Sequence, residues 1–457
     1  MVLTAISNSE SFSTGTRKSM ENSLNIVICG AGIAGLGAAI ALRKKGHLVT
    51  VVEAAPQLQE VGAGIQVPPN STRILKSWGL EEKFLANIVL PKNTLLRRYA
   101  TGEVVGRVDA NPESEQKYGY PYWFIHRADF QKILYDAATE FGIEVIFEAP
   151  VERVREDGSR TKVVLKNGEE LEADLVVGAD GIRSKTRATA IQNSIDVVES
   201  SHCAFRATVP AELMKADPAI AHFMTDPSSN VWMGPDSHIV GYPIRKGEMY
   251  NLVICRRGKA SVGKWNEPAD INEVREHYTG WEPNLRQVLS NVTSCQKWKL
   301  AYLPPLDQWI SDNGRVVIIG DAAHAMLPYM AQGAAMGIED GAALAECVAR
   351  VTDLTDLPTL LRAFQDFRKP RVDIVTEAVL SNADTFHRAD GPEQEQRDKR
   401  MKQQMEGTAP KTTEEKSQQA KVIRYADKDF QPWLYGYDTI KEVSNGLLRE
   451  AVVANFK

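Results

Sequence analysis

The sequence has few cysteines, and none belongs to a recognisable pair. The five are dispersed and odd in number, and no two have C-x-x-C spacing: Cys29, Cys203, Cys255, Cys295 and Cys347. This pattern argues against a disulfide framework and against a zinc site. The eight histidines form neither an H-E-x-x-H motif nor a His-rich tract, so no metal site is predicted. We expect buried, reduced thiols and a cytoplasmic location.

Long apolar runs are also missing, as is an excess of positive charge. No run approaches the roughly 20 residues of a bilayer-spanning helix, so no membrane span is predicted. The first 23 residues are Ser-rich and polar and predict a disordered tail, although Arg17 and Lys18 leave organelle targeting open. A net charge of -5 makes nucleic acid an unexpected partner.

What is present is the composition of a globular protein, with 43% hydrophobic and 25% charged residues. At 457 residues the chain exceeds one ordinary core, so two interleaved domains are expected.

The most informative stretch runs from Leu24 to Glu53. A short apolar run, Ile26 to Cys29, leads into a G-x-G-x-x-G turn at Gly30, Gly32 and Gly35. An Ala-rich helical segment then ends at Gly46, before a second β-branched strand. This is a βαβ unit in which the glycines allow a tight turn, close approach to a pyrophosphate and close packing of helix on strand. It predicts a dinucleotide site.

Glu53 ends the second strand, 23 residues after Gly30. A carboxylate there accepts hydrogen bonds from ribose hydroxyls and repels a 2′-phosphate, so the tightly bound nucleotide is predicted to be FAD or NAD and not NADP.

Three further segments carry candidate binding residues. The loop E-V-G-A-G-I-Q-V-P-P-N, residues 60 to 70, has Gly62 and Gly64 where a ligand could approach closely, or is an ordinary turn. Arg127 precedes an amphipathic helix and is predicted either to reach a phosphate or ribose or to form a surface salt bridge. Asp180, in G-A-D-G-I-R-S after a buried strand, either faces the nucleotide crevice or caps a helix.

Residues 196 to 295 change to short alternating strands with Pro and Gly between them, which predicts a mostly antiparallel sheet. Within it, Arg206 lies mid-strand in C-A-F-R-A-T-V and Tyr242 lies among apolar residues in H-I-V-G-Y-P-I-R. A charge in such a place is costly unless something pairs with it. The alternative is that both side chains reach water from an edge strand.

The strand pattern returns at Gly314 to Ile319, followed by G-D-A-A-H-A-M-L-P-Y-M-A-Q-G-A-A-M-G-I-E-D-G over residues 320 to 341. Asp321 follows the strand directly. A long helix is predicted to begin near Gln332 and Gly333, where Gly333 and Ala334 leave its positive N-terminus open to an electron-rich ring such as an anionic reduced flavin.

Three of these segments together carry a family resemblance: G-A-G-I-A-G with Glu53, V-G-A-D-G-I-R-S at 177 to 184, and G-D-A-A-H-A-M-L-P-Y-M-A-Q-G at 320 to 333. In this order they resemble the signatures of group A FAD-dependent aromatic monooxygenases, which have the para-hydroxybenzoate hydroxylase fold. Over roughly residues 24 to 385 the chain is most similar to the fungal-type, salicylate hydroxylase-like branch.

The resemblance implies an α/β fold, in which a Rossmann-like FAD-binding domain of the glutathione-reductase type is interleaved with the antiparallel sheet. The implied boundaries are 24–195 and 296–387 for the FAD domain, with a hairpin at 94–109 joining the sheet domain of 196–295. The N-terminal tail covers 1–23. The last part, 388–457, is expected to be helical or linker; its charged stretch 388–420 predicts a solvated segment.

The resemblance also implies roles for individual residues. Glu53 is expected to bind the adenosine ribose, Arg127 the FAD backbone and Asp321 the ribityl or ribose region, with Asp180 near both FAD and the nicotinamide. Gly333 and Ala334 are expected to present amides to the isoalloxazine, with Gly62, Ala63 and Gly64 on its other side. Arg206 and Tyr242 match positions that hold a substrate phenolate.

The chemistry so implied is reduction of FAD by NADH or NADPH, followed by oxygen transfer from a flavin C4a-hydroperoxide to an electron-rich ring. The substrate is expected to be a salicylate-like or polyketide phenol, and the protein a monomer or homodimer. Two alternatives remain: epoxidation or hydroxylation of an indole alkaloid or terpenoid intermediate on the same scaffold, and a non-catalytic binding protein built on the flavoprotein fold.

Overall fold

The computed structural model describes residues 23–58, 63–157, 160–191, 195–259, 266–408 and 426–455. The predicted N-terminal tail, apart from Ser23, and Gly62 lie outside these ranges, as does the end of the charged stretch from residue 409 onward.

A parallel five-stranded sheet forms the centre of the molecule. Its strands are, in spatial order, β18 (Val316–Ile318), β11 (Leu175–Gly178), β1 (Asn25–Cys29), β2 (Leu48–Val52) and β7 (Glu144–Ile146). The chain runs outward from β1 in one direction and then returns to β1's other side at β11. Ligands of such sheets bind beyond the carboxyl ends of the strands where the order reverses, which here lies between β1 and β11.

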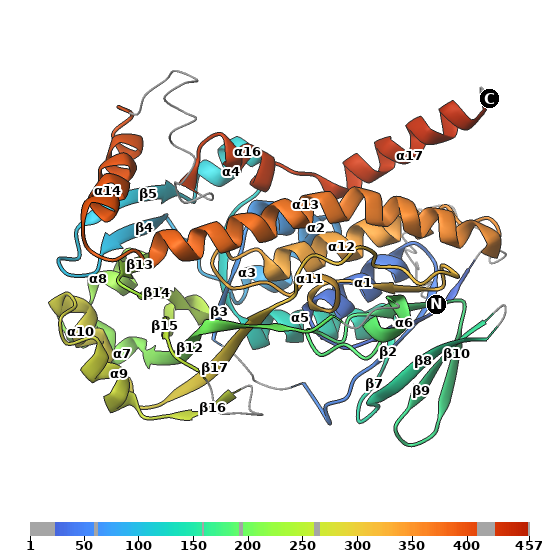
Figure 1. Cartoon of the computed structure of the whole chain (residues 1–457), viewed down its shortest axis with the longest axis horizontal. Coiled ribbons are helices and arrows are strands. Elements are labelled where there is room, and N and C mark those ends of the chain that lie inside the picture. The colour runs from blue at the N-terminus through green and yellow to red at the C-terminus, as the bar shows by residue number, and fades with distance from the viewer. Residues whose placement is uncertain are drawn as a thin grey trace, which may run out of the picture.

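Helices cover this sheet because their small and apolar residues face it. Helix α1 (Ile33–Lys44) follows β1 directly and packs against α5 (Arg127–Glu140) and α12 (Gly333–Val348). The long helix α13 (Leu357–Phe386) packs along α12 and extends across most of the molecule in Figure 1. The helix that the sequence predicts to begin near Gln332 and Gly333 begins at Gly333.

An eight-stranded sheet forms the second layer, at the left of Figure 1. It is antiparallel except where β13 pairs with β4. Its strands are, in order, β16 (Asn266–Ala269), β17 (Cys295–Tyr302), β12 (Val198–Pro210), β15 (Met249–Arg257), β14 (Ser237–Ile244), β13 (Ser228–Gly234), β4 (Asn93–Arg98) and β5 (Val104–Asp109). The hairpin β4–β5 thus lies at one edge of a sheet whose other strands come from residues 198 to 302.

Two small sheets complete the strands. Strands β3 (Gly64–Val67) and β6 (Trp123–His126) pair between the two layers, and β8 (Val151–Asp157), β9 (Arg160–Leu165) and β10 (Glu170–Ala173) form a separate meander. Short helices lie in the connections: α2 (Pro69–Ser77), α3 (Glu81–Leu85), α4 (Glu113–Tyr118), α6 (Arg187–Ala190), α7 (Ala211–Ala216), α8 (His222–Thr225), α9 (Ile271–His277), α10 (Pro283–Ser290) and α11 (Asp321–His324).

The C-terminal part is helical and returns to the body. Helix α14 (Pro392–Met405) covers strand β5, and its Gln394, Arg397 and Met401 are buried, so the described part of the charged stretch is not simply solvated. Helix α16 (Phe430–Tyr435) packs on α2, and α17 (Thr439–Asn455) runs from α12 toward the C-terminus (Figure 1).

All five cysteines lie in the described ranges and are buried, and no disulfide joins any two of them. None of the helices within the described ranges combines the length and the apolar character needed to cross a membrane.

Candidate active site

In the glycine-rich turn, each of the three positions favours glycine for a different physical reason. Gly30 has a φ of +109°, and a β-carbon there would stand 2.5 Å from the carbonyl oxygen of Ala179 at the end of β11. A β-carbon on Gly35 would collide with the carbonyl of Gly30. Gly32 has nothing within 4 Å of a β-carbon, and it lines the cavity described below. The open space at Gly32 is what close approach of a phosphate requires.

Glu53 lies beside this turn. Its carboxylate accepts hydrogen bonds from the backbone N–H of Ala31, at 2.8 Å, and of Ala55, at 2.9 Å. These two bonds fix the orientation of the carboxylate. Because an ionised carboxylate has about four acceptor positions, it can also accept from ribose hydroxyls.

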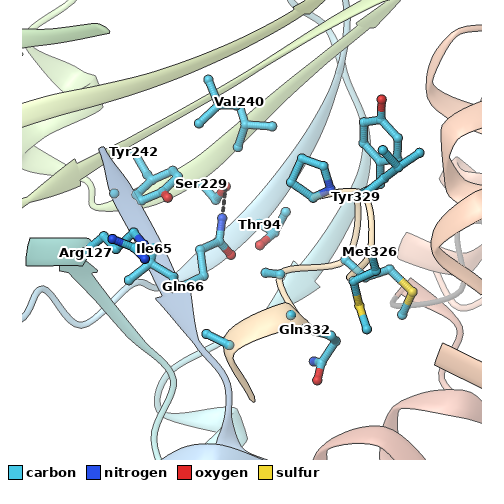
Figure 2. A pocket seen from close by; sticks show the side chains of 18 of the residues that line it. Ile65, Gln66, Thr94, Arg127, Ser229, Val240, Tyr242, Met326, Tyr329 and Gln332 are labelled. Atoms are coloured by element: carbon cyan, nitrogen blue, oxygen red, sulfur yellow. Dashed lines mark hydrogen bonds between the residues drawn. The ribbon is translucent and has the colours of Figure 1, made fainter. Parts of the chain in front are cut away.

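One cavity of about 390 Å³ connects the turn with the eight-stranded sheet. Eight of the predicted site residues line it: Gly32, Gly64, Arg127, Arg206, Tyr242, Asp321, Gly333 and Ala334. Five others lie in neighbouring backbone without lining it: Gly30, Gly35, Glu53, Ala63 and Asp180. Segments far apart in the chain therefore meet around one space, part of which Figure 2 shows.

The Asp180 carboxylate is turned toward its own loop. It accepts hydrogen bonds from the backbone N–H of Lys185, at 2.7 Å, and of Thr186, at 3.0 Å, and from the hydroxyls of Ser184 and Thr186. These bonds stabilise the loop before α6, whose N-cap is Thr186, so Asp180 is not the capping residue of that helix. Its neighbours Ala179 and Gly181 line the cavity, so Asp180 shapes the loop at the crevice.

Arg127 and Asp321 provide opposite charges on the cavity wall. Arg127 begins α5, and its backbone N–H donates to the carbonyl of Ala63 at 3.0 Å. Burial lowers the pKa of the Arg127 guanidinium, and the Asp321 carboxylate opposes that shift. Burial likewise raises the pKa of Asp321, opposed by His324 and Arg127. The exposed surface of Asp321 is cavity surface enclosed by protein, which is why its charge is poorly solvated.

A buried network of charged residues stabilises the first part of the segment from Gly320 to Ala334. Asp340 accepts from the backbone N–H of Gly320, at 3.0 Å, and lies 2.6 Å from Nε2 of His324. Arg368 donates to Asp340 at 2.9 Å and to Glu339 at 2.6 Å, and Arg371 also donates to Glu339. Asn70 donates to Glu339 at 2.7 Å.

These four ionised residues of α12 and α13 were not recognised as a unit from the sequence. The available signal was Glu339-Asp340 in a helix that otherwise contains almost only apolar and small residues. Because the network bonds Gly320 directly, it positions the backbone next to Asp321.

The floor of the cavity is one face of the eight-stranded sheet. Arg206 pairs with Val253, Val253 with Val240 and Val240 with Val231, so one cation and three valines form a row across four strands. Residues two apart on a strand share a face. A neighbouring row therefore holds Tyr242, Ser229 and Thr94, of which Ser229 and Thr94 are paired. On the other side of the valines, the paired residues His238 and Cys255 line the cavity.

Arg206 stands at one end of the valine row with incomplete pairing. Its Nε is buried and has no hydrogen-bond partner among the described residues, while its guanidinium lies 5.2 Å from the centre of the Trp298 ring. Burial and the like charge of Arg127 lower its pKa, but an arginine remains protonated in proteins. The geometry leaves a cation facing a cavity, which suits an anionic ligand group.

Tyr242 lies beside this cation with its ring against Phe124, at 4.7 Å between centroids. Burial raises its pKa well above the usual value of 10, opposed by Arg206, so its hydroxyl stays protonated. It can therefore donate a hydrogen bond to an oxyanion.

His238 was another residue that the sequence analysis did not single out. It lines the cavity, and its Nδ1 lies 2.7 Å from Nε2 of His387 at the end of α13. Its pKa is well below the usual value because of burial, the neighbouring His387 and His202. It is a neutral polar group of the floor.

Two observations of this chain show that the cavity fits a flavin dinucleotide. The crevice at Gly32 has room where a phosphate needs it. Ala334 and Gly333 begin the 16-residue helix α12 at the cavity, so backbone N–H groups at a positive helix end face it. Separately, the described residues contain no cluster of three or more side chains that could hold a metal ion.

Comparisons with known proteins agree with this site. Residues 23–379 match the model of the family described as FAD binding domain. The FAD-dependent monooxygenase OpS4 of Beauveria bassiana is 36% identical over 441 residues, covering 96% of this chain and 99% of that protein. The 3-hydroxybenzoate 6-hydroxylase of Polaromonas naphthalenivorans is 32% identical over 360 residues, covering 79% and 86%.

Among solved structures, a salicylate hydroxylase substrate complex superposes with a TM-score of 0.74 at 22% identity, covering 93% of this chain and 98% of that chain. At this identity the likeness speaks for the fold. It includes both the FAD-binding layer and the eight-stranded sheet.

Proposed function

The chain belongs to the FAD binding domain family and is an FAD-dependent monooxygenase, and from this premise we propose that it hydroxylates a phenolic substrate with NAD(P)H and O₂. Bound FAD supplies the chemistry of accepting electrons from NAD(P)H and activating oxygen. The protein's residues bind the cofactor, orient the substrate, exclude water and hold the phenol in its reactive protonation state.

Arg206 is the observation that carries the proposal. An aromatic ring is attacked by an electrophilic oxygen more readily when its hydroxyl is ionised. A cation next to a bound phenol lowers the phenol's pKa, and Arg206 has unused hydrogen-bonding capacity on the cavity floor. Tyr242, kept protonated by burial, is in place to donate to the same oxygen.

We assign the remaining predicted residues roles from the family resemblance and their positions. With FAD bound, Gly32 and Glu53 would hold the pyrophosphate and the adenosine ribose, and Asp321 and Arg127 would hold the polar chain between adenosine and the ring. Gly333, Ala334 and Gly64 would hold the isoalloxazine end. Valines 231, 240 and 253 exclude water from the substrate side, which prevents loss of activated oxygen without product.

The names of the relatives support a phenolic acid as substrate class, and a polyketide phenol remains the expectation from the family resemblance. One of them is named for hydroxylating 3-hydroxybenzoate, a phenol with a carboxylate. Within the present cavity Arg206 fits either the phenolate or such a carboxylate. A location in the cytoplasm is part of the same proposal, supported by five cysteines that form no disulfide with one another.

The test is to incubate the yellow, FAD-loaded enzyme with single phenols and phenolic acids while following NAD(P)H oxidation, hydrogen peroxide and product mass. A substrate must accelerate NAD(P)H consumption and gain one oxygen atom. Indoles and terpenoid alkenes serve as the comparison set. Turnover that is confined to that set, or a purified protein that retains no FAD, would contradict the proposal.

A further inference from the structure

The valine row of the cavity floor is longer than a single phenolic ring. Neighbouring strands lie about 4.8 Å apart, so the three steps from Arg206 to Val231 cover about 14 Å. A one-ring phenolic acid measures about 7 Å from its carboxylate to an opposite hydroxyl, from bond lengths of about 1.5 Å. If one end of such an acid is held at Arg206, the far part of the floor is left uncovered.

The far end of the floor is polar and built from neutral groups. Figure 2 shows Gln66 reaching into the cavity beside Thr94 and Ser229. The Gln66 Nε2 donates to the hydroxyl of Ser229 at 3.3 Å, and Gln66 Oε1 accepts from the Tyr122 hydroxyl at 2.9 Å. Ser229 is fully buried and forms part of the cavity wall.

These groups keep hydrogen-bonding capacity for a ligand. A serine hydroxyl that accepts one bond still has its own proton to donate, and an amide nitrogen with one bond has a second N–H. Polar groups buried without a partner are costly, so an oxygen atom placed here by a ligand would be favoured.

The charged residues along the cavity indicate which kind of ligand oxygen fits the far end of the floor. Of the described residues that line it, only Arg127 and Arg206 carry a permanent positive charge, and Arg206 lies at the opposite end of the valine row. The charged residue near Thr94 is Asp109, which pairs with Arg107 at 2.8 Å. A second carboxylate at the far end would therefore find no lining cation to pair with, whereas a hydroxyl or ketone needs none.

We propose that Val253, Val240 and Val231, together with Ser229, Thr94 and Gln66, form a substrate subsite for an apolar substituent on the phenol that ends in a neutral oxygen group. The preferred substrate is then an alkyl- or acyl-chain phenol, or one with a second ring, and not a simple benzoate. This subsite rests on the proposed phenol hydroxylation, because it extends from the end of the floor where the phenolate is held.

The experiment compares three ligands on the FAD-loaded enzyme: resorcinol, resorcinol with a pentyl chain, and the same compound with a ketone near the chain end. The dissociation constant is taken from the change in flavin absorbance on titration. Each buried methylene contributes about 0.8 kcal/mol, so we expect the chain ligands to bind at least about tenfold more tightly than resorcinol.

Two variants separate the apolar and the polar part of the subsite. Val231→Phe fills the far end of the row, and we expect it to abolish the advantage of both chain ligands over resorcinol. The double variant Ser229→Ala/Thr94→Val preserves volume and is expected to weaken the ketone ligand by about three- to tenfold and the pentyl ligand little. Ser228→Ala is the matched control, because Ser228 neighbours Ser229 on β13 but is not part of the cavity wall.

Equal binding of all three ligands by the original enzyme would overturn the subsite, as would equal weakening of all three by the double variant. If Val231→Phe retains no FAD, the volume-preserving double variant decides the matter. If none of the phenols changes the flavin spectrum or speeds NAD(P)H oxidation, the proposed function fails, and the subsite fails with it. A hydroxylated resorcinol product without any chain preference leaves the function in place and removes only the subsite.

Discussion

The ring of Tyr242 lies directly over Gly64. A β-carbon on Gly64 would stand 2.5 Å from Cε2 of that ring and 2.8 Å from its hydroxyl oxygen. The backbone N–H of Gly64 donates to Oδ1 of Asn251 at 2.7 Å, and Asn251 pairs with Tyr242 across β14 and β15. Strand β3, which lines the cavity, is thus fixed against the eight-stranded sheet that carries Arg206 and Tyr242.

Because this packing involves the ring and not the hydroxyl proton, Tyr242→Phe is expected to retain FAD and the fold. Loss of one hydrogen bond to an ionised oxygen costs about 1.5–3 kcal/mol, so kcat/KM for a phenol should fall about 10- to 100-fold. Stopped-flow measurement of the reduced enzyme's oxidation by O₂ with substrate bound checks this. Turnover at the original rate would show that the hydroxyl does not hold the reacting oxygen.

Arg206→Gln removes the cation and keeps a polar side chain of similar length. We expect FAD content to be unchanged and coupled hydroxylation to fall about 10²- to 10³-fold, as for other removed charge-stabilising donors. The direction of the pH effect is fixed: without the cation the bound phenol's pKa rises, so the remaining activity should increase toward higher pH.

The control for this variant is Arg257→Gln, since Arg257 is exposed on neighbouring β15 and pairs only with Asp236 at the surface. It should behave as the original enzyme. A pH profile of Arg206→Gln that coincides with the original profile would contradict the assigned role.

Substitution by alanine is expected to have different effects at Gly32 and at Gly35. Gly32→Ala meets no protein atom within 4 Å, so the protein should fold with its original thermal stability but bind FAD at least about tenfold more weakly. Gly35→Ala would push α1 away from the turn, so it should lower the unfolding temperature even without cofactor. FAD binding by fluorescence quenching and unfolding of the apoprotein distinguish the two.

The sequence predicted the features that depend on residues close together in the chain, and it missed those that depend on contacts between distant residues. The Gly30 turn, Glu53 and the start of α12 at Gly333 are local signals, so spacing along the chain was sufficient to place them. The family resemblance added the expectation that Asp321 and Arg206 lie at the same cavity. The pairing of Ser229 with Thr94 depends on the parallel register of β13 and β4, which no local pattern encodes.

The same limit explains the buried charges and Asp180. Arg368 and Glu339 are 29 positions apart on two helices, and only the packing of α12 on α13 brings them together. For Asp180 both alternatives were local, whereas the bonds that its carboxylate accepts within its own loop, from Thr186 among others, were seen only in the structure.

Asp340 provides a test of the buried network by pH. Burial by itself raises the pKa of its carboxyl, but His324, Arg368 and the N–H of Gly320 more than offset this and lower the pKa to about 2, from the usual 3.8. Because the folded pKa is the lower one, this stabilisation is present above about pH 4 and is lost as the pH falls toward 2. A difference of almost two units corresponds to about 2 kcal/mol.

The difference in unfolding free energy between the original protein and Asp340→Asn should therefore decrease by about 2 kcal/mol between pH 5 and pH 2. Urea unfolding, followed by tryptophan fluorescence at one FAD concentration, measures it. Asp136→Asn is the control, because Asp136 forms an exposed pair with Lys132 that is worth well under 1 kcal/mol. A constant difference across this pH range would mean that Asp340 is not held ionised by His324 and Arg368, and the fixed position of Gly320 beside Asp321 would then need another cause.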